Sequence, residues 1–300
     1  MNFLIDLIKG IFVGVANVIP GVSGGTMAVS FGIYDKLLSS ISNLLKSFKK
    51  SFLTLLPIVI GMALGVVGFA YIIPYLLKNF PFATSAAFTG IIVGGIPAII
   101  RSLKDGWQNE KKKSLPINII VFIIFLAIAI SMLFLNGDSE SGIVLIANAG
   151  TVIKIFFMGI IASATMVIPG VSGSLILMIL GYYFGIINAV KDFIDALRAF
   201  DMSAMIKQLY ILIPFALGCV LGIFFISKLI NYLLHHFPSA TFCAILALVL
   251  SSPISIFFKV NEEYSMSHTP IASIIVGIVL FIVCVALTLF MEKLSPQESE

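Results

Sequence analysis

Charged residues along this chain are confined to short clusters that separate long apolar runs. Asp, Glu, Lys and Arg are absent from eight runs, which cover 10–34, 51–77, 79–100, 114–137, 155–190, 208–227, 229–258 and 264–291. A helix needs about 20 apolar residues to cross a bilayer, so most of these runs suffice for one crossing. The run 155–190 has 36 residues and is too long for one. The pattern predicts an all-α polytopic membrane protein.

The composition agrees with lipid as the main solvent of the chain. Of the 300 residues, 60% are hydrophobic and only 11% are charged, too few polar groups to cover a soluble domain of this length. The basic residues behind the net charge of +4 lie between apolar runs, as is typical of cytoplasmic loops. A basic stripe on a soluble face is missing, so we expect no nucleic-acid partner. The first residues, MNFLIDLIKG, lack the features of a cleaved secretory signal and should remain in the mature protein.

The cysteines give no sign of a metal or redox centre. Cys219, Cys243 and Cys284 all lie inside apolar runs, without a CxxC pair or neighbouring histidine ligands. We expect packed, reduced thiols. The sequence predicts no metal site, no cofactor and no catalytic residue.

The sequence repeats itself across its two halves. The hexapeptide IPGVSG occurs at 19–24 and again at 168–173, an offset of 149 residues. A second block, 56–84, aligns with 213–241 at an offset of 157. A duplicated half with a broken apolar segment at matching positions is typical of transporters.

We therefore expect one integrated membrane domain made of a first repeat, 1–137, and a second repeat, 138–300. Each repeat should hold a Pro-Gly-broken segment followed by three transmembrane helices. The broken segments, 11–33 and 152–187, are predicted to enter the membrane and return as re-entrant helical hairpins. Two helices of about 10–15 residues, hinged at PGVSG, fit the long run better than one helix.

Re-entrant segments would give each repeat an odd number of crossings and the two repeats an inverted topology. If each segment instead spans once, the repeats are parallel. That alternative has in its favour four basic residues that the inverted arrangement puts outside, Lys191, Arg198, Lys207 and Lys259. We give more weight to segment length and expect inverted repeats.

The repeated motif has the chemistry of an anion site. Proline begins a helix well but interrupts one already formed, and glycine lets the backbone turn and a ligand approach closely. The serine of each copy should lie in the first turn of a new half-helix, whose unpaired N–H groups and partial positive charge attract phosphate. We predict one central phosphate site enclosed by both copies and formed by Gly21, Val22, Ser23, Gly24, Gly25, Thr26, Gly170, Val171, Ser172, Gly173 and Ser174.

The structural alternative is a kink that packs helices through small residues. A single PGVSG would favour that alternative, whereas two identical hexapeptides at matching places in a duplicated chain favour a site. The copies differ because Leu175 stands where the first copy has Thr26, so the two need not be equal.

With these residues in view, the chain resembles the bacterial polyprenyl-phosphate transporter family of the PopT type. KGIFVGVANVIPGVSGGTMAVSFGIYDKLL (9–38) is similar to the N-terminal signature of that family, and IPGVSGS (168–174) and GIIVGGIPAI (90–99) are similar to later ones. The resemblance covers essentially the whole chain. It implies paired re-entrant segments and the return of undecaprenyl phosphate, the lipid carrier of cell-wall synthesis, to the inner leaflet of the cytoplasmic membrane.

Two departures from the family pattern concern the symmetry of the halves rather than the function. Gly95 stands where a serine is common in the family, and the second half has Ser251 and Ser252 in place of a glycine pair.

Three classes of function follow from these observations. A lipid-phosphate flippase would move its substrate inward against an inside-negative potential, at about 2.3 kcal/mol per charge per 100 mV, and would need protonation or a coupling cation, H+ or Na+. A small-anion channel or exchanger could use the same broken helices. A lipid-pyrophosphate phosphatase would need an arginine beside the phosphate and buried carboxylates, yet no Asp or Glu interrupts the apolar runs. We expect the transporter and not an enzyme.

Overall fold

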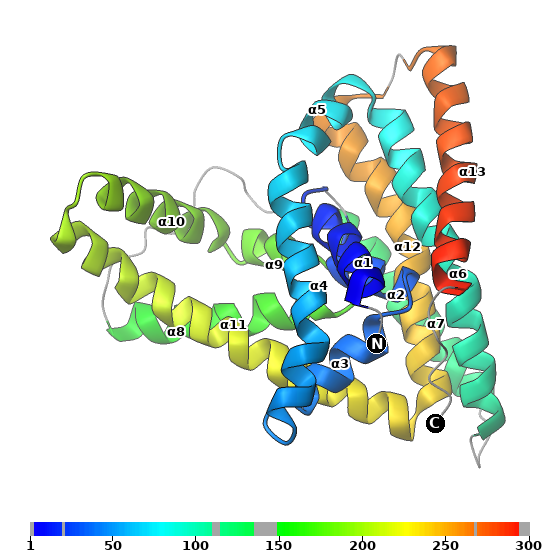
Figure 1. Ribbon diagram of the computed structural model, residues 1–300, viewed down its shortest axis with the longest axis horizontal. Helices are drawn as coiled ribbons and strands as arrows, with labels where there is room; N and C mark the ends of the chain where they lie inside the picture. The colour runs from blue at the N-terminus through cyan, green and yellow to red at the C-terminus, as the bar shows by residue number, and fades with distance from the viewer. Residues whose placement is uncertain (1–2, 20–21, 110–114, 135–148, 267–268, 294–300) are drawn as a thin grey trace. The chain divides into compact units, whose positions relative to one another are not determined.

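In a computed structural model of the chain, residues 3–19, 22–109, 115–134, 149–266 and 269–293 are described, and every regular element within them is helical. The elements, shown in Figure 1, are α1 (Phe3–Ala16), α2 (Gly24–Ser30), α3 (Tyr34–Ser42), α4 (Phe48–Phe69), α5 (Ile72–Asn79), α6 (Pro81–Asn109), α7 (Leu115–Ser131), the 3-10 helix η1 (Met132–Phe134), α8 (Ala149–Val167), α9 (Gly173–Ile179), α10 (Tyr183–Arg198), α11 (Met202–His236), α12 (Pro238–Tyr264) and α13 (Ile271–Lys293). The predicted all-α class is confirmed.

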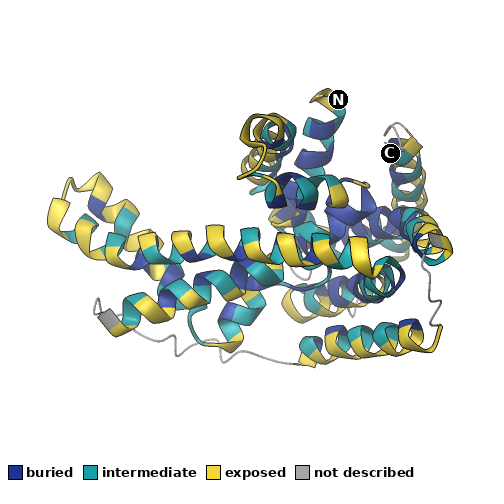
Figure 2. Ribbon diagram, turned by 90° about the horizontal axis from the view of Figure 1, so that it is seen from below, coloured by how far each residue is buried: buried dark blue, intermediate teal, exposed yellow. Residues whose placement is uncertain are grey.

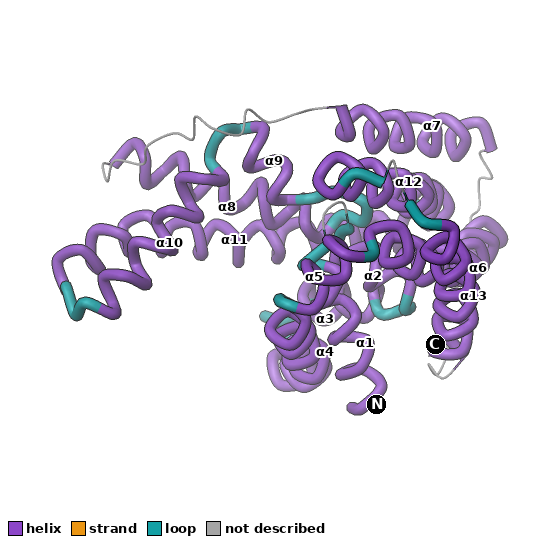
Figure 3. Tube along the Cα trace, turned by 90° about the horizontal axis from the view of Figure 1, so that it is seen from above, coloured by secondary structure: helices purple, strands orange, loops and turns teal. Residues whose placement is uncertain are grey.

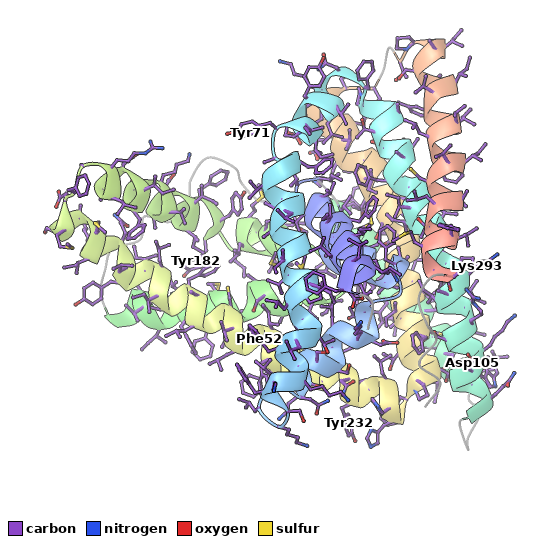
Figure 4. The ribbon with its side chains drawn as sticks, in the orientation of Figure 1. Phe52, Tyr71, Asp105, Tyr182, Tyr232 and Lys293 are labelled. Atoms are coloured by element: carbon purple, nitrogen blue, oxygen red, sulfur yellow. The ribbon has the colours of Figure 1, made fainter. Side chains whose placement is uncertain are left out.

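Seven of the described helices are long and apolar enough to cross a membrane: α4, α6, α7, α8, α11, α12 and α13. The chain is therefore a multi-pass membrane protein. Many large apolar side chains on these helices are exposed, among them Phe52 and Tyr232, which are labelled in Figure 4. Such a surface would aggregate in water but is suited to lipid.

The helix boundaries repeat at the offsets found in the sequence. The short helix α2 begins at Gly24, and α9 begins at Gly173, 149 residues later. Farther along, α6 begins at Pro81 and α12 at Pro238, 157 residues later. The duplication of sequence is therefore also a duplication of local structure.

Both motif copies interrupt a helix, as predicted. α1 ends at Ala16 and α8 at Val167, just before the motif prolines. The helices that follow have only seven residues each, shorter than the 10–15 expected. Glycines stop them early: Gly32 and Gly181 have left-handed φ values of +66° and +78°.

The same hydrogen bond closes both glycine turns. Ile33 N donates to Ala28 O and Tyr182 N donates to Leu177 O, each at 2.9 Å. A left-handed glycine with a bond of this span is the Schellman stop of a helix. Each broken segment therefore turns twice, and the second turn bends the chain by 108° between α9 and α10.

The helices form two compact units. The first unit comprises 1–133, 168–171 and 227–300, and the second comprises 134–167 and 172–226. In the first unit α1 crosses α4, and in the second α8 is similarly close to α11. A Cβ on Gly61 would lie 2.2 Å from Leu7 O, and one on Gly218 would lie 2.1 Å from Phe156 O. These two glycines and these two carbonyls are related by the repeat, so the same crossing is built twice.

The core of the first unit is a pair of repeat-related helices, α6 and α12, which pack against each other. The last helix of each repeat covers the other repeat: α13 packs on α6, and α7 packs on α12 (Figure 3). The apolar stretches of α6 and α12 are 61% and 50% buried, against 17% for α7 and α13. Few residues of α7 are buried, and this helix is mostly teal and yellow at the lower right of Figure 2.

Candidate functional site

The first motif copy places Ser23 at the start of α2 as its N-cap. The backbone of Ser23 is extended, with φ −99° and ψ 135°, and its Oγ accepts a hydrogen bond from the Gly25 N–H at 3.2 Å. Ser23 is buried, whereas Gly24 and Gly25 are half-buried. Because the hydroxyl accepts here, its own proton remains for a further acceptor. Gly21, also predicted for the site, lies outside the described residues.

The second copy has the same plan in the second unit. Ser172 caps α9 with φ −101° and ψ 118°, and its Oγ accepts from the Leu175 N–H at 3.4 Å. The Ser174 hydroxyl lies 2.9 Å from that of Ser172, which adds a second polar group at this end of α9. Gly173 lies so close to α8 that a Cβ would come within 2.4 Å of Ala162 O. The two capping serines thus share an extended backbone, but Ser23 accepts from the second residue after it and Ser172 from the third.

A hydrogen-bonded chain links both motif copies inside the first unit. The Gly170 N–H donates to Thr26 Oγ1 at 2.8 Å. Thr26 Oγ1 lies 3.3 Å from Ser252 Oγ, and Ser252 Oγ donates to Leu248 O at 3.2 Å. Because the proton of Ser252 goes to Leu248, Thr26 is the donor to Ser252. The chain Gly170, Thr26, Ser252, Leu248, called here the threonine bridge, is complete at every step.

The threonine bridge fixes Gly170 in a conformation that favours glycine. Its φ is +74°, and a Cβ would lie 2.6 Å from Leu248 O, the acceptor at the end of the bridge. Thr26 and Ser252 are almost wholly buried, with exposed fractions of 0% and 1%. In this structure the Thr26 hydroxyl and the Gly170 N–H, both predicted for the phosphate site, are bonded to each other.

The bridge has no counterpart at the repeat-related positions. Leu175 corresponds to Thr26 and Gly95 corresponds to Ser252, and neither side chain can form a hydrogen bond. Gly95 instead lies against α2, where a Cβ would come within 2.3 Å of the Ser30 Cα. The two departures from symmetry therefore involve residues that contact each other. Thr26 and Ser252 each carry a hydroxyl, whereas the related Leu175 and Gly95 carry none.

A buried charge cluster lies at the other end of α2. Lys9 is 1% exposed, and its Nζ donates at 2.7 Å to Phe31 O, the carbonyl just after α2. Asp6, one turn earlier on α1, is paired with Lys36 of α3 at 2.6 Å. Burial lowers the pKa of Lys9 from its ordinary 10.5 to about 8, and the negative charge of Asp6 partly opposes this shift.

The sequence pattern does not predict this cluster. Asp6 and Lys9 precede the uncharged run 10–34 and resemble loop charges that flank a membrane segment. The signal that could have identified them is their absence from the second repeat, where the related residues are apolar.

Polar groups also lie inside the helical core. Among the described residues, the buried hydroxyl oxygens of Ser85, Thr89 and Ser227 have no hydrogen-bond partner. Ser85 and Thr89 are one turn apart and so lie on the same face of α6. Buried hydroxyls without partners are costly in a packed core, so this face of α6 has unused hydrogen-bonding capacity.

A multi-pass helical protein with duplicated, serine-capped helix breaks has the architecture of a membrane transporter. The family model described as Undecaprenyl phosphate translocase-like matches residues 13–274, and the chain belongs to this family.

Curated relatives agree with this assignment. A polyprenyl-phosphate transporter of Staphylococcus aureus is 32% identical over 278 residues, which cover 92% of this chain and 94% of the relative. A polyprenyl-phosphate transporter of Vibrio cholerae is 32% identical over 267 residues, which cover 84% of this chain and 77% of the relative. No solved structure matches the chain. The family and both relatives are named for transport, which confirms the prediction of a transporter rather than an enzyme.

Proposed function

We propose that the protein returns undecaprenyl phosphate, or a related polyprenyl phosphate, from the outer to the inner leaflet of the bacterial cytoplasmic membrane for reuse in cell-wall polymer synthesis. One observation carries the proposal: the serines of both motif copies cap short helices with the same backbone geometry. The names of the family and of the curated relatives supply the substrate class.

In this proposal the motif residues of both copies hold the phosphate, with Ser23 and Ser172 as the principal side chains. Each hydroxyl already accepts a backbone N–H and can donate its own proton to a phosphate oxygen. Hydrogen bonds to a charged acceptor contribute about 1.5–3 kcal/mol each. Thr26 and Gly170 contribute through the threonine bridge, which holds in shape the loop just before α9, called here the second motif loop.

The proposal also includes the membrane arrangement expected from the sequence. The repeats 1–137 and 138–300 are inverted, and 11–33 and 152–187 re-enter the membrane. Inward movement of a phosphate against the membrane potential costs about 2.3 kcal/mol per charge per 100 mV, so transport is coupled to an ion gradient of H+ or Na+.

Binding to the purified protein tests the substrate class. The protein in detergent should bind a polyprenyl phosphate and be indifferent to chloride at physiological concentration. Competition by chloride, together with chloride flux in proteoliposomes, would instead support a small-anion channel. Release of inorganic phosphate from polyprenyl pyrophosphate would support a phosphatase and contradict the proposal.

A further inference from the structure

The buried charge cluster has no equivalent in the second repeat. The residues related by the repeat to Asp6, Lys9 and Lys36 are all uncharged: Ile155, Met158 and Gly185. Ile155 is fully buried, just as Asp6 is buried in the first repeat. Both segments nevertheless form a long helix, a break, a seven-residue helix and a glycine turn.

The second repeat is therefore an internal control for the first. Its uncharged residues build the same local fold, so the charges of the cluster are not required for that fold. Burying ammonium and carboxylate groups carries a desolvation cost that their pairing recovers only in part. Two buried charges, Asp6 and Lys9, kept at this cost in one repeat alone point to a role beyond folding.

The position of Lys9 relates it to the motif. Its ammonium holds Phe31 O at the C-terminal end of α2, while Ser23 caps the N-terminal end of the same helix. A helix of this length is about 10 Å long. A cation is favourable at the C-terminal end of a helix and an anion at the N-terminal end. The charge on Lys9 and the charge of a bound phosphate thus act on the two ends of one short, rigid element.

We propose that Lys9 is the proton-binding group that couples transport to the proton gradient, holding α2 in its phosphate-binding arrangement while protonated and releasing it on losing the proton. This inference rests on the proposed function of the motif. The only covalent change is the loss of one proton from the ammonium to water, which leaves a neutral amine. The amine can still donate to Phe31 O, but without the strength of a charge-assisted bond.

The charges around Lys9 suit an exchangeable proton. Asp6 of α1 favours the ammonium, as does Glu292 of α13, while Lys36 of α3 disfavours it. Glu292 is itself paired with Arg101 of α6, and Asp6 with Lys36. α2 carries no charged residue, and the lysines of α4, Lys49 and Lys50, are exposed. The opposing charges are thus partly neutralised, and burial leaves the pKa of Lys9 about 8, within reach of physiological pH.

The test compares the pH dependence of polyprenyl phosphate binding by full-length protein in detergent. From about pH 7 to about pH 9.5 the wild type should lose affinity by about tenfold, because a positive charge about 10 Å from the phosphate disappears. Lys9→Arg keeps its charge across this range and should retain its pH 7 affinity throughout. Ionisation of the lipid itself is common to both proteins. Lys9→Met, which carries the residue of the second repeat, should bind weakly at both pH values.

An equal loss of affinity in the wild type and in Lys9→Arg would overturn the coupling role of Lys9. If neither the wild type nor the variants bind the lipid at any pH, the proposed function fails instead. Thermal unfolding then tests the titration of Lys9 directly, without the lipid. The pKa of Lys9 is lower in the folded than in the unfolded state, so the unfolded chain binds more protons between about pH 8 and 10.5 and stability rises with pH there. The Tm of the wild type should rise in this window relative to Lys9→Met. A constant difference in Tm would also overturn the proposal.

Discussion

Replacing Thr26 by valine should loosen the second motif loop while leaving α2 intact. Valine has nearly the shape of threonine but cannot accept the Gly170 N–H, which lies at 2.8 Å in the threonine bridge. Ser252 keeps its bond to Leu248 O, so the main change is that the Gly170 N–H is left without its acceptor. A donor left without a partner in a buried site costs about 1–3 kcal/mol. The variant should therefore be less stable by that amount.

The assay is thermal unfolding in detergent together with polyprenyl phosphate binding. Each kcal/mol should lower Tm by about 2–4 °C in a protein of this size class. Disorder of the second loop should weaken binding by about fivefold, the equivalent of about 1 kcal/mol of lost preorganisation.

Thr288→Val is the matched control. Thr288 is also 0% exposed, but its hydroxyl donates to Cys284 O of its own helix at 2.9 Å, so valine leaves no backbone N–H without a partner. Its Tm and binding should stay near those of the wild type. If Thr26→Val matches this control in both measurements, the threonine bridge does not hold the loop and the reasoning is refuted.

Three further predictions concern the loop, the topology and the coupling. Gly170→Ala should reduce the yield of folded protein in size-exclusion chromatography more than Thr26→Val does. The alanine Cβ would lie 2.6 Å from Leu248 O, and the backbone at this position has a φ of +74°. A normal yield would contradict the role of this contact in fixing the loop. In a cysteine-free background, Leu45→Cys and Asp195→Cys should be labelled from opposite sides of the membrane, and labelling from one side would exclude inverted repeats. Inward flipping in proteoliposomes should be faster with an ion gradient, and equal initial rates with and without one would count against coupling.

The features predicted correctly from the sequence are local ones that occur twice. The break at each PGVSG and the cap by each serine depend on residues within a few positions of each other, and the repeat supplies an independent second copy. The predicted length of the short helices was wrong because Gly32 and Gly181 end them early. The left-handed conformation of these two glycines nevertheless follows from the type of residue.

Contacts between distant segments could not be predicted in this way. Thr26 and Ser252 are 226 residues apart, and each taken alone is an ordinary polar residue in an apolar helix. The sequence also does not predict that the last helix of each repeat packs on the other repeat, α13 on α6 and α7 on α12. An evenly apolar helix does not encode which neighbour it contacts. In the charge cluster, Lys9 reaches Phe31 O only because α1 and α2 fold back on each other.

The two capping serines provide the most direct test of the central claim that the duplicated motif binds the lipid phosphate. The measurement is the binding and inward transport of polyprenyl phosphate by a Ser23→Ala/Ser172→Ala variant, compared with the wild type and with Ser30→Ala. Ser30 lies on α2 as well, but its hydroxyl donates to Thr26 O of the same helix, at 3.0 Å. Each capping serine should contribute about tenfold in affinity, so the double variant should bind about a hundredfold more weakly and fail to transport, while Ser30→Ala behaves as the wild type. Wild-type binding and transport by a double variant of matched thermal stability would contradict the account.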